Sequence, residues 1–260
     1  MAETWDRRIR RAEELTVGGG PESPLLAFYA RLLQSQKAVY ESLKNRRPSG
    51  SIEDDVLQIA QSGSALLHDV ADDGPDQLVA EARTLLQSDD STKRDLLLTY
   101  WRDRSDRNFF AKALLQPCAQ WLATAGMATI GQRPEGAGNR CPRCGGAPQL
   151  SIFETAGAVA GDGSSRQLLC ATCLATWPFR RVVCPQCGEE DERKLGYFQS
   201  TAFEHVRVDA CDSCGRYLKS VDVGRLGLAV PLVDEVAGAS LDVWALEHGY
   251  QKIELNLLGL

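Results

Sequence analysis

Eight cysteines arranged as four Cys-x-x-Cys pairs carry the clearest chemistry of this chain. Thiolates bind zinc or iron with tetrahedral geometry, and four sulfurs complete one such site. The pairs therefore contain enough ligands for two four-sulfur sites, with zinc and iron equally compatible. The predicted ligands are Cys141, Cys144, Cys170, Cys173, Cys184, Cys187, Cys211 and Cys214.

Three of the pairs carry a glycine directly after the second cysteine: Gly145, Gly188 and Gly215. Glycine adopts positive φ without steric cost, and this lets backbone N–H groups turn toward the sulfurs of a metal-binding turn, or knuckle. Leu174 occupies the same place after Cys173. Three pairs therefore have the complete knuckle pattern and one lacks its glycine.

The first and third intervals between the pairs are long and the second is short. This pattern suggests two copies of one module, each consisting of a knuckle, a hairpin and a second knuckle. Strands are expected at 149–155 and 167–169 in the first module, and at 194–199 and 205–208 in the second. We expect the knuckles to combine sequentially, first with second and third with fourth. A crossed arrangement is the alternative.

Two other uses of cysteine fit less well than metal binding. Structural disulfides are typical of small, cysteine-dense secreted chains, whereas this chain has 9 cysteines in 260 residues and no apolar segment resembling a secretion signal. A thioredoxin-type redox site needs a single pair at the start of a helix, whereas four pairs are present here. We therefore favour two metal sites.

The remaining sequence predicts an ordinary globular protein. The composition is 43% hydrophobic and 25% charged, and the net charge of −6 comes without a basic stripe for nucleic acid. No stretch is apolar enough to enter a membrane. Helical spacing of apolar residues predicts a helical bundle in residues 1–130, in which Arg7, Arg8, Arg10 and Arg11 lie on the solvent-exposed side of the first helix.

The expected fold class is a mainly α N-terminal bundle followed by two small β-hairpin metal modules of the zinc-ribbon kind and a C-terminal helix, a multi-domain α+β chain. A linker rich in glycine and proline is placed at 131–140. The first metal module spans 141–180, the second spans 181–222, and a helix with an apolar tail occupies 223–260.

Two further residues have ordinary interpretations. Cys118 stands alone in an apolar helix, where a cysteine usually serves as a small buried hydrophobe. His205 is interpreted as a solvent-facing strand residue, because eight cysteines already supply both sites. No Ser-His-Asp triad is recognisable.

The motifs as a set resemble the formate dehydrogenase accessory protein FdhE family. The similarity is carried by Leu-Cys-Ala-Thr-Cys-Leu-Ala-Thr-Trp at 169–177, Arg-Val-Val-Cys-Pro-Gln-Cys-Gly at 181–188 and Ala-Cys-Asp-Ser-Cys-Gly-Arg-Tyr-Leu-Lys at 210–219. The second knuckle of the family also lacks the glycine. The resemblance covers most of the chain beyond residue 105.

The resemblance implies a cytoplasmic assembly factor, not an enzyme, that binds the catalytic subunit of formate dehydrogenase and supports its maturation. It also implies that the metal modules are rubredoxin-like, with two ions of iron or zinc on four cysteines each. The alternatives are a rubredoxin-like electron-transfer protein and a zinc-ribbon adaptor for nucleic acid or transcription. The oligomeric state is left open.

A basic and aromatic face near the knuckles is the predicted surface for that partner. Aromatic residues and arginine dominate binding hot spots, and such residues follow the second and fourth knuckles. We expect them to share one exposed face, and the alternative for the aromatic residues near the knuckles, Tyr217 among them, is that they fill the core of the small modules. The residues are Arg180, Arg181, Arg216, Tyr217 and Lys219.

Overall fold

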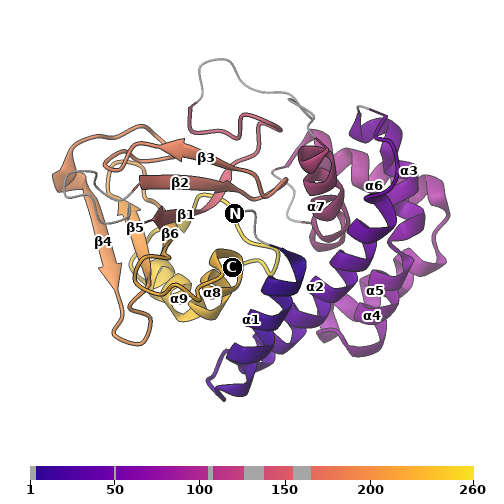
Figure 1. Ribbon diagram of the computed structural model, residues 1–260, viewed down its shortest axis with the longest axis horizontal. Coiled ribbons are helices and arrows are strands. Elements are labelled where there is room, and N and C mark those ends of the chain that lie inside the picture. Colours follow the sequence, from indigo (N-terminus) through magenta and orange to yellow (C-terminus); the bar gives the residue numbers. More distant parts are fainter. Residues whose placement is uncertain (1–3, 50, 105–107, 126–137, 155–164) are drawn as a thin grey trace.

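The computed structural model describes residues 4–49, 51–104, 108–125, 138–154 and 165–260 (Figure 1). The first half of the chain is helical, as the sequence predicts. Its helices are α1 Trp5–Val17, α2 Ser23–Leu43, α3 Ile52–Ser62, α4 Ser64–Asp73, α5 Asp76–Gln87, α6 Asp90–Arg102 and α7 Phe109–Thr124. Most of the predicted linker lies outside the described residues, and the predicted domain boundaries remain predictions.

Local sequence explains where several helices begin and end. Asp89 accepts a hydrogen bond from the Thr92 amide at 2.7 Å at the start of α6, and such side-chain caps satisfy amides that lack a helical partner. Gly63 separates α3 from α4. A Cβ at Gly63 would come within 2.3 Å of the Leu114 side chain, so this turn packs closely on α7, and any larger residue would displace Leu114.

The second half of the chain forms one mixed sheet rather than two separate hairpins. The strands are β1 Pro148–Glu154, β2 Ser165–Cys170, β3 Thr176–Phe179, β4 Leu195–Gln199, β5 Val206–Cys211, β6 Arg216–Asp222 and β7 Gln251–Lys252, with a short helix η1 at Glu192–Lys194. The strand order is β3-β2-β1-β6-β5-β4, and β7 also pairs with β6. Both hairpins expected from the sequence are present, and each gains a third strand.

The two metal modules are joined at the centre of this sheet. Strands β1 and β6 run parallel, with Leu150 opposite Lys219 and Ile152 opposite Val221. Because β1 belongs to the first module and β6 to the second, their pairing fixes one module relative to the other.

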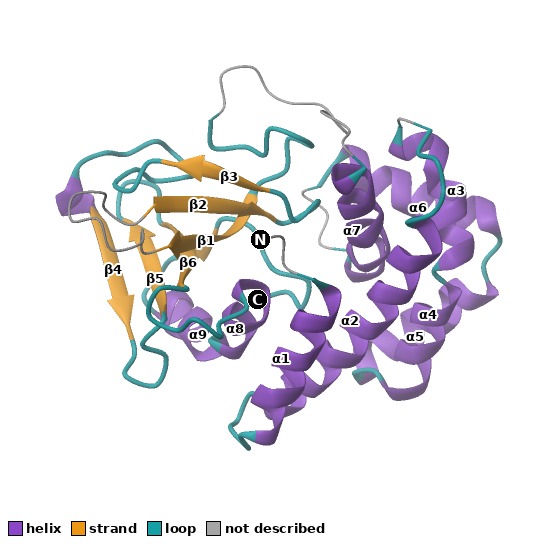
Figure 2. Ribbon diagram, in the orientation of Figure 1, coloured by secondary structure: helices purple, strands orange, loops and turns teal. Residues whose placement is uncertain are grey.

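Helices α8 Pro231–Ala237 and α9 Ala239–Glu247 lie along one face of the sheet (Figure 2). Alternate residues of β5, such as Val206 and Val208, pack there against Leu241 and Ala245. The intervening positions of a strand point to the opposite face. That second face carries the polar residues of β5.

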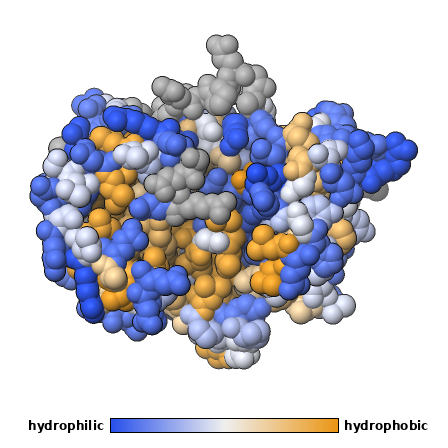
Figure 3. Space-filling model, turned by 180° about the vertical axis from the view of Figure 1, so that it is seen from behind, coloured by the Kyte–Doolittle hydropathy of each residue, from blue (hydrophilic) through white to orange (hydrophobic). Residues whose placement is uncertain are grey.

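The helical region packs directly on the sheet region. The Gln116 amide on α7 donates to the Ala171 carbonyl at 3.0 Å, and Lys112 donates to the Leu255 carbonyl at 2.6 Å. Seen from behind, apolar residues gather in the centre of the face and polar residues cover its flanks (Figure 3). Among the described residues, no helix is both long and apolar enough to cross a membrane.

Candidate metal centres

The structure groups the eight cysteines sequentially into two sets of four. The first cluster consists of Cys141, Cys144, Cys170 and Cys173, and the second of Cys184, Cys187, Cys211 and Cys214; within each, all ligand atoms lie within 4.8 Å of one another. The crossed arrangement is therefore not the one formed. In each cluster, one Cys-x-x-Cys pair precedes the first strand of the hairpin and the other lies at the end of its second strand.

The sulfur spacing fits a tetrahedral ion. The Sγ atoms of Cys141 and Cys173 are 3.5 Å apart, and those of Cys144 and Cys170 are 3.4 Å apart. In the second cluster, Cys184 and Cys214 are 3.8 Å apart. An ion with metal–sulfur bonds of about 2.3 Å places its four sulfurs about 3.8 Å from one another. Each cluster can therefore hold one metal ion on four cysteines.

The knuckles have the backbone shape that sulfur ligation requires. The φ angles of Gly145, Gly188 and Gly215 are 71°, 79° and 64°. Leu174 has a φ of 56°, so the second knuckle adopts the same left-handed turn without glycine. The Leu174 side chain packs beside an apolar cluster that contains Leu150, and this contact offsets the cost of a positive φ at a leucine.

Backbone amides face the sulfurs in these turns. The Thr172 amide donates to Cys170 Sγ at 3.3 Å, and the Gln186 amide donates to Cys184 Sγ at 3.4 Å. Such bonds stabilise a thiolate over a thiol. The turns are therefore arranged to support the charged form of the ligands.

The thiols in each cluster differ in their proton affinity. Burial raises the pKa of Cys170 far above its ordinary value and that of Cys184 to about 11, whereas hydrogen bonding to Cys144 and the other cysteines lowers the pKa of Cys141. Because metal binding requires thiolates, an ion entering either cluster must displace protons. Metal affinity at both clusters therefore weakens as the pH falls.

The two clusters differ in exposure. All four cysteines of the first cluster are buried and belong to the main apolar core together with helix α7. Arg104 covers this cluster by donating to the Cys144 carbonyl at 2.7 Å. In the second cluster Cys187 is exposed and Cys214 is half-buried. Solvent therefore reaches the second cluster more easily than the first.

The predicted partner face is divided between two sides of the sheet. Arg180 is exposed and binds Glu190 at 2.8 Å, Arg181 is exposed, and Arg216 is half-buried. Tyr217 and Lys219 are 1% and 0% exposed and point to the α9 side. The expectation that Lys219 shares an exposed face with the arginines is wrong, because strand alternation and the docking of α9 bury it.

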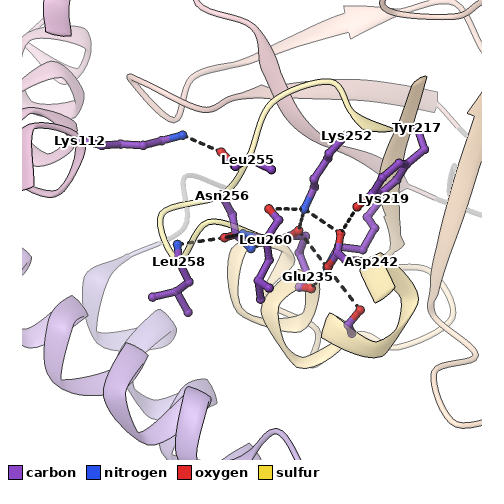
Figure 4. A network of polar contacts seen from close by, with 11 residues as sticks. Lys112, Tyr217, Lys219, Glu235, Asp242, Lys252, Leu255, Asn256, Leu258 and Leu260 are labelled. Atoms are coloured by element: carbon purple, nitrogen blue, oxygen red, sulfur yellow. Dashed lines mark hydrogen bonds and ion pairs between the residues drawn. The ribbon is translucent and has the colours of Figure 1, made fainter. Parts of the chain in front are cut away.

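Lys219 belongs to a buried ionic network that sequence reasoning missed (Figure 4). Its Nζ lies 3.0 Å from Glu235, and it also pairs with Asp242, which accepts a hydrogen bond from Tyr217 Oη at 2.7 Å. Lys252 contacts the same two carboxylates. Two lysines and two acids therefore neutralise one another inside the protein and attach β6 and β7 to α8 and α9.

The network changes the acidity of Glu235. Burial by itself raises the pKa of this carboxyl, but the charges of Lys219 and Lys252 and a hydrogen bond from Asn256 outweigh burial and lower it to about 2. Glu235 is therefore ionised over the whole physiological range. The only feature of the sequence that could have indicated this network is the presence of Glu235 and Asp242 within apolar helices, and that feature alone is also compatible with exposed acids.

The remaining residues complete the comparison with the sequence predictions. Cys118 is fully buried as predicted, and burial raises the pKa of its thiol. His205 precedes β5 and lies outside both clusters, but its Nε2 is 2.8 Å from Asp234, so it does not face solvent. Arg7 and Arg10 are exposed as predicted for the solvent side of α1, whereas Arg8 is 2% exposed and stacks on Trp5, and Arg11 is half-buried.

Comparison with known proteins identifies consistent relatives. A sequence profile described as "FdhE, C-terminal domain" matches residues 182–258. A "Protein FdhE homolog" from Aquifex aeolicus is 36% identical over 121 residues, which cover 46% of this chain and 42% of that protein. This alignment spans less than half of the Aquifex relative.

More distant relatives match over nearly the whole chain. A "Protein FdhE homolog" from Haemophilus influenzae strain PittEE is 24% identical over 274 residues, covering 97% of this chain and 87% of that protein. The crystal structure of the FdhE protein from Pseudomonas aeruginosa has a TM-score of 0.72 and 22% identity, covering 98% of this chain and 94% of that one. This last similarity supports the fold.

Proposed function

Because the chain belongs to the FdhE family, we propose that it is an accessory protein that binds the catalytic subunit of formate dehydrogenase and supports formation of the active enzyme. The proposed place of action is the cytoplasm. The observation that carries this proposal is the pair of four-cysteine clusters built into one sheet, in the chain order that the family similarity predicts.

The chemistry of the clusters suits a binding protein better than a hydrolytic enzyme. A tetrahedral ion held by four cysteines has no open position for a substrate or water. A bound ion would instead fix two knuckles and the hairpin between them. The pairing of β1 with β6 extends this rigidity across both modules. The sheet region then presents loops in a fixed geometry to a partner.

Electron transfer is the second candidate function, and the exposure of Cys187 favours it. A metal-bound sulfur at the surface gives a redox partner short access to the ion. Iron on four cysteines would supply a one-electron couple. A reversible one-electron wave from the iron-loaded protein would support this function, and a protein that carries only zinc would contradict it.

Affinity capture tests the proposed function directly. The tagged protein, incubated with extract from cells that express a formate dehydrogenase, should retain the catalytic subunit and should not oxidise formate by itself. The control is the double variant Cys141→Ser and Cys184→Ser, which removes one ligand from each cluster and should retain less subunit. Recovery of nucleic acid or transcription proteins without the dehydrogenase would instead support the zinc-ribbon adaptor.

A further inference from the structure

The face of the sheet away from α8 and α9 contains a cavity of about 410 Å³ beside the second cluster. Strands β1, β2, β4, β5 and β6 contribute to it, together with the segment between the two modules. We call it the arginine cavity after Arg166, Arg181, Arg207 and Arg216, which line it together with Phe153 and Tyr197.

Three guanidinium groups gather around Phe153. The carbons at the centres of the Arg166, Arg181 and Arg207 guanidinium groups lie 5.9, 5.8 and 4.4 Å from the ring centroid. Arg207 also lies 5.2 Å from the Tyr197 ring. These are cation–π distances, and such contacts orient a guanidinium group while its N–H groups stay available to an anion.

Arg166 shows that the cavity is held in place from within. Only 5% of this residue is exposed. Its Nη1 donates to the carbonyls of Arg181 and Val183 at 3.1 and 3.0 Å, which attaches the inter-module segment to the sheet. Its buried Nε has no hydrogen-bond partner among the described residues. Arg166 is therefore held mainly by the protein itself, and it fixes the wall of the cavity on which the more exposed arginines lie.

The positive charge of the cavity is only partly neutralised. Asp209 binds Arg207 at 2.8 Å and lies 3.7 Å from Arg166. Within the part of the chain that the structure describes, neither Arg181 nor Arg216 forms an ion pair. No guanidinium group of the cavity hydrogen-bonds to a cysteine sulfur among those residues either. Glu192 also lines the cavity, but among the described residues it forms no ion pair with Arg181 or Arg216, so these two guanidinium groups remain available for an incoming anion.

Strand β4 adds a second recognition element at the same place. Among the described strands it is the last of the sheet and pairs with β5 alone, and it lines the cavity through Leu195, Gly196 and Tyr197. Its sequence contains no charged residue and no proline, and its register with β5 is regular. Edge strands usually carry charges, prolines or bulges that prevent pairing with another chain. β4 lacks these features and is able to accept a further strand.

We propose that the arginine cavity and β4 bind an extended acidic segment of the partner protein. The backbone of that segment pairs with the free edge of β4, and the segment continues across the mouth of the cavity, where its carboxylates reach Arg181 and Arg216. The proposal rests on the proposed function for the identity of the partner, and on the cavity alone for the chemistry of the segment.

Direct titration with a model peptide tests the site. The probe is a labelled peptide in which glutamate alternates with threonine, measured by fluorescence anisotropy against the full-length protein with both clusters loaded. The substitution Arg181→Glu should weaken binding by about tenfold or more, because it replaces an attraction by a repulsion. Arg180→Glu is the matched control. It makes the same charge change one residue away but outside the cavity, and should alter the affinity by less than about twofold.

Further arms of the experiment separate the alternatives. A peptide with glutamine in place of glutamate should bind much more weakly, and equal binding would overturn the proposal. Equal binding by the Arg181→Glu and Arg180→Glu proteins would overturn it as well, as would displacement of the peptide by a single-stranded oligonucleotide that binds more tightly. Metal content and thermal unfolding of each variant establish that it is folded.

The proposed function can fail independently of this site. If the wild-type protein binds the peptide through Arg181 but captures no dehydrogenase subunit, the cavity proposal stands and the function proposal falls. If both wild-type and Arg181→Glu proteins capture the subunit equally, the function stands and the cavity proposal falls.

Discussion

Arg11 on α1 donates two hydrogen bonds to the carboxylate of Asp234 on α8, at 3.1 and 2.6 Å. Asp234 is almost fully buried, and it also accepts a hydrogen bond from the Val230 amide at 2.7 Å and lies 2.8 Å from His205. This one carboxylate therefore connects the first helix, the C-terminal helices and the sheet. Its pKa is lowered because these hydrogen bonds outweigh the effect of burial.

Replacing Arg11 with methionine should reduce the free energy of unfolding by about 2 kcal/mol, because a buried carboxylate loses its charged donor. Urea unfolding followed by circular dichroism measures the change. Arg10→Met is the matched control: Arg10 lies on the same helix but is exposed, and its replacement should cost less than about 0.5 kcal/mol. Equal stability of the two variants would show that the contact between α1 and α8 contributes nothing.

Glu235 should make the protein sensitive to acid in a defined range. Its pKa is lowered from an ordinary value of 4.5 to about 2 in the folded state. A carboxyl whose pKa is lower in the folded state than in the unfolded state stabilises the fold at any pH above the unfolded-state pKa. This contribution is lost as the pH falls through the folded-state pKa. The free energy of unfolding should therefore decrease as the pH falls from 4.5 to about 2.

The variant Glu235→Gln isolates this contribution. It should be less stable at neutral pH by about 3 kcal/mol, because two buried lysines lose a shared partner. Its stability should also depend less on pH in the acid range. Metal loss at low pH affects both proteins, so the difference between their pH profiles reports Glu235. Parallel profiles would contradict the lowered pKa.

The two clusters should lose metal independently and at different rates. Cys141→Ser and Cys184→Ser should each release one ion while the helical region stays folded, as measured by metal analysis and circular dichroism. In the wild-type protein a chelator should empty the second cluster first, because Cys187 is exposed whereas the first cluster is buried. Unchanged metal content in both variants would refute two four-cysteine sites, and loss of both ions from one variant would indicate coupled sites.

The left-handed turn at Gly188 should be needed for stability of the second cluster. A Cβ at this position meets no atom within 4 Å, but the φ of 79° disfavours any side chain. Gly188→Ala should therefore cost about 1 kcal/mol and weaken metal binding at this cluster. Gly227→Ala tests the assignment, since its Cβ also meets nothing and its φ lies outside the left-handed range. If the two variants are equally stable, backbone strain is not the cause.

Local features of the chain were predictable from sequence because their causes are local. The Cys-x-x-Cys spacing and the following glycine define a knuckle within a few residues, and the repeated long interval, which a hairpin spans, favours sequential pairing of the knuckles. Apolar residues at helical spacing likewise predicted the helical half. Cys118 was correctly assigned to the core, since a lone cysteine in an apolar helix has few other roles.

Tertiary structure decided the features that join distant segments. A lysine in a strand has the same local sequence signature whether its side chain meets water or two carboxylates, and only the docking of α8 and α9 placed Glu235 and Asp242 beside Lys219. The parallel pairing of β1 with β6 and the convergence of arginines on Phe153 also depend on which strands become neighbours. Sheet order is set by the burial of whole strand faces against the helices, so it has no signature in the spacing of any single motif.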